Sequence, residues 1–226
     1  MQPLVLLVVL VIVVGIHAKK QYKNSGYQDA SGHNYYETMT DPGRKGEYLT
    51  FRCLKGLGEE HKLLTNVYLP KEDGTTTEID LIMVSATGIY VFESKNYSGW
   101  IFGDEKSKFW TQSLKGGKKF RFYNPIWQNK KHISVLQKHL SLGSEVFRSY
   151  IIFSERYELK KMFVHSPDVK VMNRSVLFRE IRYDIANLPE VLTIEEINQI
   201  YNELSRYALA DAATKQAHID AMKWRN

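Results

Sequence analysis

Two short apolar segments on either side of a tight turn constrain this chain more than any other feature. Residues 76–84 and 89–95 are rich in β-branched and aromatic side chains, and Ala86, Thr87 and Gly88 separate them. This pattern predicts an antiparallel β-hairpin. Because most neighbours on both strands are apolar, the hairpin belongs in the interior of a sheet. The rest of the core has to be built around it.

The predicted hairpin carries charged side chains where an interior strand pair would be apolar. If Val84 faces Ile89 across the turn, then Asp80 faces Glu93, with Cβ atoms about 4.5–5.5 Å apart. Glu93 and Lys95 are two residues apart and so point to the same face of their strand. Two carboxylates this close repel each other unless a proton or a cation lies between them. The pattern predicts a site for Mg²⁺ or Mn²⁺ with an ammonium group beside it.

Two other interpretations of the hairpin stay open at this point. An exposed strand face with an ordinary Glu–Lys neighbour pair would carry the same residues, and such pairs are common on solvated surfaces. A register slipped by one residue would separate the two acids.

The N-terminus predicts a membrane segment. An uninterrupted apolar run covers residues 3–16, which is shorter than the roughly 20 residues of a full span, and Lys19, Lys20 and Lys23 follow it. A cleaved signal peptide would have a positive charge before the run, which is absent, and a small-x-small cleavage site, for which Ile16 and His17 make residues 15–18 a poor match. We therefore expect a retained single-pass anchor over residues 1–20. The positive-inside rule then places the C-terminal domain in the cytoplasm. Cys53, the lone cysteine, fits that compartment.

Residues 21–40 are rich in Tyr, Ser, Gly and Asn and show no apolar periodicity, so we expect a linker between membrane and domain. An arm packed by its tyrosines is the alternative. Beyond it, capping residues and apolar patterns predict helices and strands in a mixed order. The expected helices start at Asp41-Pro42, Asn124-Pro125 and Thr193, and further strands cover 62–69, 109–114, 118–122 and 150–153, with 163–172 extended. This order predicts an α/β (α+β) fold with a mixed central sheet flanked by helices.

A basic segment suggests a polyanionic partner. The net charge is only +6, but residues 106–144 hold nine Lys or Arg and no acid. Within it, cations alternate with aromatic rings that can stack on bases. A solvated hairpin with core aromatics, or attraction to anionic lipid, would also explain the pattern. The candidate nucleic-acid-binding residues are Lys115, Lys118, Lys119, Arg121, Lys130 and Lys131.

Several short motifs occur together in a fixed order and resemble the nuclease-related (NERD) domain, a member of the PD-(D/E)xK nuclease-like superfamily. The motifs are Gly46-Glu47, Glu78-Ile-Asp80, Gly88 to Tyr97 with Glu93-Ser-Lys95, Gly99, Trp110, and Asn124-Pro125 followed by Gln128. The resemblance implies a restriction-endonuclease-like core. It gives a nuclease-like domain over 41–155 and leaves 156–226 as an extension whose strand and helices complete it.

The resemblance also implies residue roles. Asp80 and Glu93 would hold the metal with the Ser94 carbonyl, and Glu47 would be a further acidic ligand or base. Lys95 would act on the attacking water or on the developing phosphate charge. Gln128 would lie near Lys95, although a surface position on its helix is the plain alternative, as it is for Glu47. His132 and His139 are expected to be surface or core residues, because no third ligand accompanies them.

The sequence thus predicts a membrane-anchored, Mg²⁺- or Mn²⁺-dependent nuclease acting on DNA or RNA, and the superfamily makes a homodimer possible. A non-catalytic module that keeps the fold and binds nucleic acid or anionic lipid is the alternative. A secreted nuclease released by signal cleavage is a third. The complete Glu47, Asp80, Glu93 and Lys95 set favours the enzyme.

Overall fold

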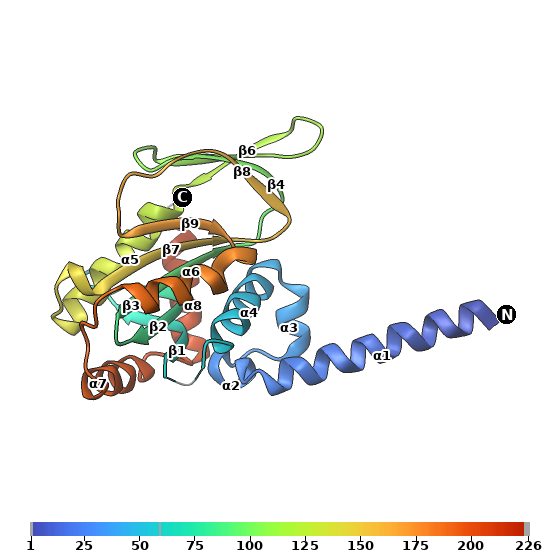
Figure 1. Cartoon of the computed structure of the whole chain (residues 1–226), viewed down its shortest axis with the longest axis horizontal. Coiled ribbons are helices and arrows are strands. Elements are labelled where there is room, and N and C mark those ends of the chain that lie inside the picture. The colour runs from blue at the N-terminus through green and yellow to red at the C-terminus, as the bar shows by residue number, and fades with distance from the viewer. Residues whose placement is uncertain (1, 59, 224–226) are drawn as a thin grey trace.

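The computed structural model describes residues 2–58 and 60–223 and contains two mixed β-sheets flanked by helices (Figure 1). The larger sheet has the order β1-β2-β3-β7-β9, in which β1 to β3 are antiparallel and β7 and β9 run parallel to β3. The predicted α/β (α+β) class is confirmed. Its strands are β1 (Lys62–Pro70), β2 (Thr76–Ser85), β3 (Gly88–Lys95), β7 (Phe147–Phe153) and β9 (Val169–Asn173).

The register of the β2–β3 hairpin is the predicted one. Val84 faces Ile89 and Ser85 faces Gly88, and the pairing continues to Leu81 and Phe92. This finding excludes the slipped register. Gly88 is required at the turn because its φ is +132° and a Cβ there would lie 2.5 Å from the Val146 carbonyl oxygen.

Helices cover both faces of the larger sheet. On one face, α4 (Pro42–Lys55) and α6 (Arg174–Asn187) pack over Leu81, Met83 and Phe92. On the other, α5 (Pro125–Leu140) and α7 (Ile194–Ser205) pack over a cluster of branched aliphatic side chains. The predicted capping residues are in place: the side chains of Asp41, Asn124 and Thr193 each accept a hydrogen bond from the first turn of their helix. The 3₁₀ turn Ser144–Val146 leads into β7, and α8 (Ala212–Lys223) follows α7.

A second sheet of order β6-β5-β4-β8 lies beside the first (Figure 1). Sequence patterns predicted its β5–β6 hairpin but not β4 or β8. Its core is aromatic: Trp110 stacks on Phe153 with ring centroids 6.1 Å apart. Gly103 is needed because a Cβ there would lie 2.5 Å from the Trp110 ring. The strands are β4 (Gly99–Asp104), β5 (Phe109–Ser113), β6 (Lys119–Tyr123) and β8 (Tyr157–Phe163).

Residues 21–40 differ from the expected tether. They complete α1 (Gln2–Asn24) and form two short helices, α2 (Tyr27–Ser31) and α3 (Tyr35–Thr40). Tyr22 and Tyr27 are buried with Tyr48 and Phe51 of α4. The physical reason is the apolar body of the tyrosine rings, which fills the core beside α4 although the segment has a polar composition. The tyrosine-packed arm is the arrangement found.

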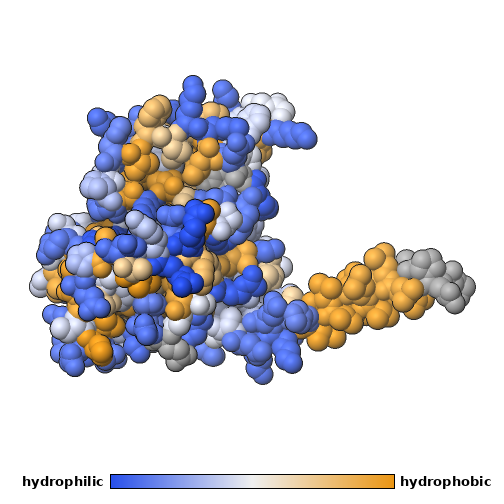
Figure 2. Space-filling model, viewed as in Figure 1, coloured by the Kyte–Doolittle hydropathy of each residue, from blue (hydrophilic) through white to orange (hydrophobic). Residues whose placement is uncertain are grey.

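The N-terminal part of α1 extends away from the domain (Figure 1), with its apolar side chains exposed along its length (Figure 2). Residues Val5–Asn24 form a helix long and apolar enough to cross a membrane. A signal sequence near an N-terminus has the same properties. Because α1 continues without a break to the buried Tyr22, the domain begins directly at the end of the apolar segment.

Candidate active site

At the end of β3, the side chains of Glu93 and Lys95 both point toward helix α5. Glu93 is 2% exposed, and Lys95 donates from Nζ to its Oε1 at 2.6 Å. Lys95 Nζ also donates to Oε1 of Gln128 on α5 at 3.1 Å. Both β3 side chains contact α5, as their spacing of two residues requires. The glutamine expected near Lys95 therefore lies within hydrogen-bond distance of it.

Asp80 lies on β2 just beyond the last hydrogen-bonded pair of the hairpin, and its side chain is half-buried. Its Oδ2 accepts a hydrogen bond from the backbone N–H of Ser94 at 3.1 Å. This hydrogen bond links the Asp80 side chain to β3, the strand that carries Glu93 and Lys95. The Ser94 hydroxyl contacts that of Thr50 on α4 at 3.2 Å, which ties the strand to the helix.

Glu47 reaches this region from α4. Its Oε2 accepts a hydrogen bond from the Tyr27 hydroxyl at 3.5 Å. Gly46 explains the close approach of the helix, because a Cβ there would lie 3.1 Å from Cβ of Asn96, which follows β3. The Gly46 carbonyl also accepts a bond from Arg174 Nη1 at 3.0 Å. The Gly-Glu pair thus combines a packing residue with a charged one.

Two residues at the site were missed or assigned otherwise from sequence. His132 was expected to be an ordinary surface or core histidine, and it is buried, but its Nε2 lies 3.4 Å from Oε2 of Glu93. Its Nδ1 lies 2.8 Å from the Thr77 hydroxyl, which holds the ring. The spacing of seven residues between His132 and His139 on α5 did not indicate a place at the site. The spacing of four residues between Gln128 and His132 could have indicated it, because residues four apart lie on the same face of a helix. Tyr27 lay in the presumed linker.

Burial and neighbouring charges shift the pKa values of the ionisable side chains at this site. Burial, together with the charges of Glu78 and Glu93, raises the pKa of Glu47 to about 7. Burial and the neighbouring Glu93 and Glu47 raise the pKa of Asp80 well above its usual value. Burial alone would raise the pKa of Glu93, but the Lys95 ammonium and the His132 ring outweigh it and lower that pKa. For Lys95, burial opposes the charge, yet Glu93 and Asp80 raise its pKa, so the amine is protonated at neutral pH.

The three carboxylates of the site, Glu47, Asp80 and Glu93, suit a hard divalent cation because they offer oxygen ligands. Glu93 Oε2 is fully buried and makes no hydrogen bond of good geometry among the described residues. Asp80 and Glu93 lie on adjacent strands, and a cation between them would relieve the repulsion that raises the pKa of Asp80. Within residues 2–58 and 60–223, however, no three His, Cys, Asp or Glu side chains are gathered to hold a metal ion. Glu47 is nevertheless close enough for its charge to help raise the pKa of Asp80.

The predicted nucleic-acid-binding cations fall into two groups. Lys115 in the β5–β6 turn and Lys118, Lys119 and Arg121 on or beside β6 are exposed. Lys130 and Lys131 lie on α5, where Lys130 pairs with Glu105 at 2.9 Å and Lys131 Nζ lies 4.8 Å from the Tyr123 ring centroid. Lys130 is thus tied to Glu105 by an ion pair, and its side chain is 47% exposed.

Asn124-Pro125 is a scaffold motif. The Asn124 side chain accepts from Ile126 N–H and donates to the carbonyls of Glu105 and Ser107 at 3.0 and 2.8 Å. It is fully buried and joins the start of α5 to the second sheet. One turn further along α5 comes Gln128. The motif therefore fixes the helix that presents Gln128 and His132 to the site.

The fold and this site define a PD-(D/E)xK nuclease-like protein. The chain belongs to the nuclease-related domain family, whose model matches residues 42–154. An uncharacterized protein of Bacillus anthracis is 34% identical over 179 residues, which cover 78% of this chain and 82% of that protein. No solved structure matches the chain.

Proposed function

We propose that the protein is a membrane-anchored, metal-dependent nuclease that hydrolyses phosphodiester bonds in DNA or RNA. The single observation that carries this proposal is the group of Asp80, Glu93, Lys95 and Gln128 at one end of the hairpin, inside a nuclease-related domain. A cluster of buried charges costs stability, and such clusters of strongly perturbed groups are typical of functional sites. The oxygen donors and the fixed ammonium match what phosphodiester hydrolysis requires.

The residues divide the work by their chemistry. Asp80 and Glu93 would hold Mg²⁺ or Mn²⁺, with the Ser94 carbonyl as a further donor, and the bound ion would supply Lewis acidity and lower the pKa of its water. Lys95, held protonated by Glu93, places a positive charge where the phosphate gains negative charge. Glu47, with a pKa of about 7, can accept a proton from the attacking water at neutral pH.

The outer surface of the second sheet is the part that would bind the substrate. Arg121 lies 4.8 Å from the centroid of the Phe109 ring, and Lys160 lies 5.7 Å from that of Trp100. Phe109 and Trp100 are 40% and 46% exposed. Exposed rings beside cations can stack on bases while the cations neutralise phosphates. The sheet follows directly after the site, since β4 begins at Gly99.

The decisive test is cleavage by the full chain in detergent, because Tyr22 and Tyr27 are part of the core and a fragment starting at residue 41 would lose them. Plasmid DNA, single-stranded DNA and RNA are incubated with Mg²⁺, Mn²⁺ or EDTA. We expect metal-dependent cutting that Asp80→Asn and Lys95→Ala abolish. Cutting that persists in both variants at the wild-type rate would contradict the proposal.

A second candidate is a module that binds nucleic acid without cleaving it. The observation that favours it is that no three His, Cys, Asp or Glu side chains in the described part of the chain are gathered to hold a metal ion. Salt-sensitive retention of nucleic acid without any cutting would support this alternative.

The orientation follows from Lys19, Lys20 and Lys23, which come after the apolar segment and would stay on the cytoplasmic side. Protease treatment of intact cells should then leave a C-terminal tag protected. Digestion of the tag without permeabilisation would reverse this topology.

A further inference from the structure

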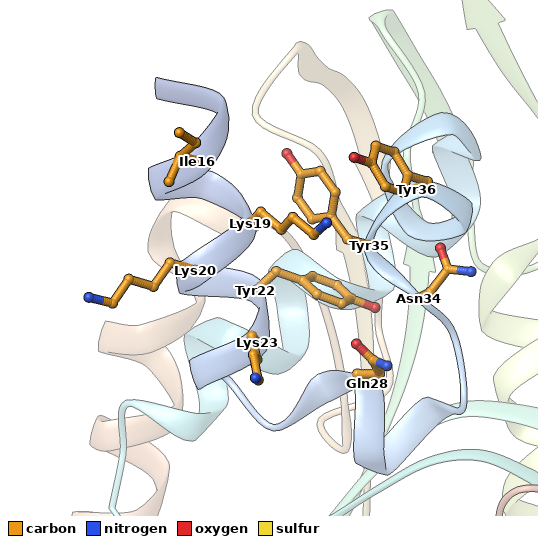
Figure 3. Close-up of a pocket in the computed structure, with 9 residues that line it drawn as sticks. All are labelled: Ile16, Lys19, Lys20, Tyr22, Lys23, Gln28, Asn34, Tyr35 and Tyr36. Atoms are coloured by element: carbon orange, nitrogen blue, oxygen red, sulfur yellow. The ribbon is translucent and has the colours of Figure 1, made fainter. Parts of the chain in front are cut away.

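A cavity lies where α1 leaves the apolar segment and meets the domain. It has a volume of about 520 Å³ and is open to solvent. Ile16 and the lysines of α1 form one wall, and α3 with the loop before it forms the other (Figure 3). Its lining residues are Ile16, Lys19, Lys20, Tyr22, Lys23, Gln28, Asn34, Tyr35 and Tyr36.

The charge of this cavity is positive and uncompensated. Lys19, Lys20 and Lys23 form no ion pair with any residue in 2–58 or 60–223. Lys19 extends toward α3, and its Nζ lies 5.2 Å from the centroid of the Tyr36 ring (Figure 3). Tyr36 is 65% exposed, so the ring and the amine both face the opening. An anion entering here would meet the Lys19 ammonium and a tyrosine hydroxyl, and Lys20 and Lys23 add positive charge at the rim (Figure 3).

The apolar side of the cavity points to a lipid rather than a small anion. Ile16 is 64% exposed, and the exposed side chains of α1 toward the N-terminus form an apolar surface (Figure 2). A ligand with a phosphate and an acyl chain could place the phosphate at Lys19 and the chain along Ile16. Tyrosine rings and lysines are typical of the membrane–water interface, where these two chemistries meet.

We propose that this cavity binds the headgroup of an anionic glycerophospholipid of the bilayer. The bound lipid would fix how the domain sits against the membrane, since α3 packs on α4, the helix that carries Glu47. The proposal rests on the membrane insertion of α1 but not on nuclease activity.

The test is lipid binding by the full chain in a neutral detergent, followed by native mass spectrometry with phosphatidylglycerol or phosphatidylcholine as probe. We expect about a tenfold preference for phosphatidylglycerol. The double variant Lys19→Gln/Lys23→Gln should reduce that preference to within twofold. The matched control Lys106→Gln/Lys161→Gln removes the same charge from exposed positions far from α1, in the turn after β4 and on β8, and should keep it. Equal binding of both lipids by wild type, or equal loss in the control, would overturn the proposal.

A separate arm keeps insertion distinct from headgroup binding. Wild type and both double variants are floated with vesicles of phosphatidylcholine alone. We expect all three to float, because the apolar part of α1 is unchanged. Wild type that fails to float would overturn the proposal whatever its preference in micelles, because the cavity would then not lie at a bilayer surface.

Discussion

Glu93 and Glu105 are both buried carboxylates that accept a hydrogen bond from a lysine, but their surroundings differ. Glu105 accepts from Lys130 and from the backbone N–H groups of His165 and Ser166 at 2.9, 2.8 and 3.0 Å, and also from the Ser166 hydroxyl. These bonds outweigh its burial and lower the pKa of Glu105 to about 2. Both of its oxygens are satisfied.

The Glu93 site is built in the opposite way. Glu93 Oε2 makes no hydrogen bond of good geometry among the described residues and has the His132 Nε2 atom 3.4 Å away, and repulsion helps to raise the pKa of the neighbouring Asp80. A buried carboxylate with all its bonds made stabilises a fold, whereas one left incomplete beside a second acid is typical of a binding site. The contrast separates the structural ion pair of this protein from the candidate active site.

The largest expected effect is on catalysis. Lys95→Ala should lower kcat/KM for cleavage by about a thousandfold or more. It removes the ammonium group that would stabilise the negative charge developing on the phosphate in the transition state. Lys170 offers a matched control, because it also forms an ion pair with a buried carboxylate. Its Nζ lies 2.5 Å from Oδ1 of Asp184, and neither residue belongs to the candidate active site. Lys170→Ala should keep cleavage within about twofold.

Because Lys95→Ala leaves Glu93 without its partner, thermal unfolding must accompany the assay. Lys95→Gln, which restores a hydrogen-bond donor without the charge, is the second variant. If Lys95→Gln folds and retains wild-type cleavage, the ammonium has no catalytic role.

Stability changes of opposite sign should separate the two carboxylate sites. Glu105→Gln replaces a charge that accepts bonds at both oxygens and should lower the free energy of unfolding by about 2–3 kcal/mol. Asp80→Asn removes a repelled charge and should raise stability in EDTA by about 1 kcal/mol or more. Chemical denaturation of the full chain in detergent at pH 7 measures both. Destabilisation by Asp80→Asn equal to that of Glu105→Gln would mean that Asp80 is a structural residue too.

The contribution of Glu105 to the free energy of unfolding should be lost in a defined range of acidic pH. Its folded pKa of about 2 lies below the ordinary value of 4.5, so its stabilisation is complete above about pH 5 and is lost as the pH falls toward 2. Unfolding free energies measured at several pH values should therefore converge for wild type and Glu105→Gln at the acid end. A constant difference between the two proteins from pH 6 to pH 3 would contradict the assigned pKa.

The hairpin site could be predicted because its geometry follows from local rules. The turn at Ala86-Thr87 fixes the register, and the period of two places Glu93 and Lys95 on one face. The tyrosines of residues 21–40 and the strands β4 and β8 were not predictable in this way. Their partners lie far along the chain: β4 pairs in parallel with β8 from Gly99 opposite Tyr157 onward. Likewise, Lys130 carries no sign of its ion pair with Glu105, 25 residues earlier.

Gln128 gives the smallest expected effect and the finest test of the comparison. It supplies one neutral acceptor to Lys95 at 3.1 Å, so its removal should leave the charge in place but free the amine to turn. Gln128→Met, which keeps the length of the side chain, should lower kcat about five- to tenfold with little change in KM, equivalent to about 1–1.4 kcal/mol. Gln128→Glu keeps an acceptor and should retain more activity than Gln128→Met. If both variants cleave like wild type, Glu93 alone positions Lys95, and this lysine is held by a single carboxylate as Lys130 is held by Glu105.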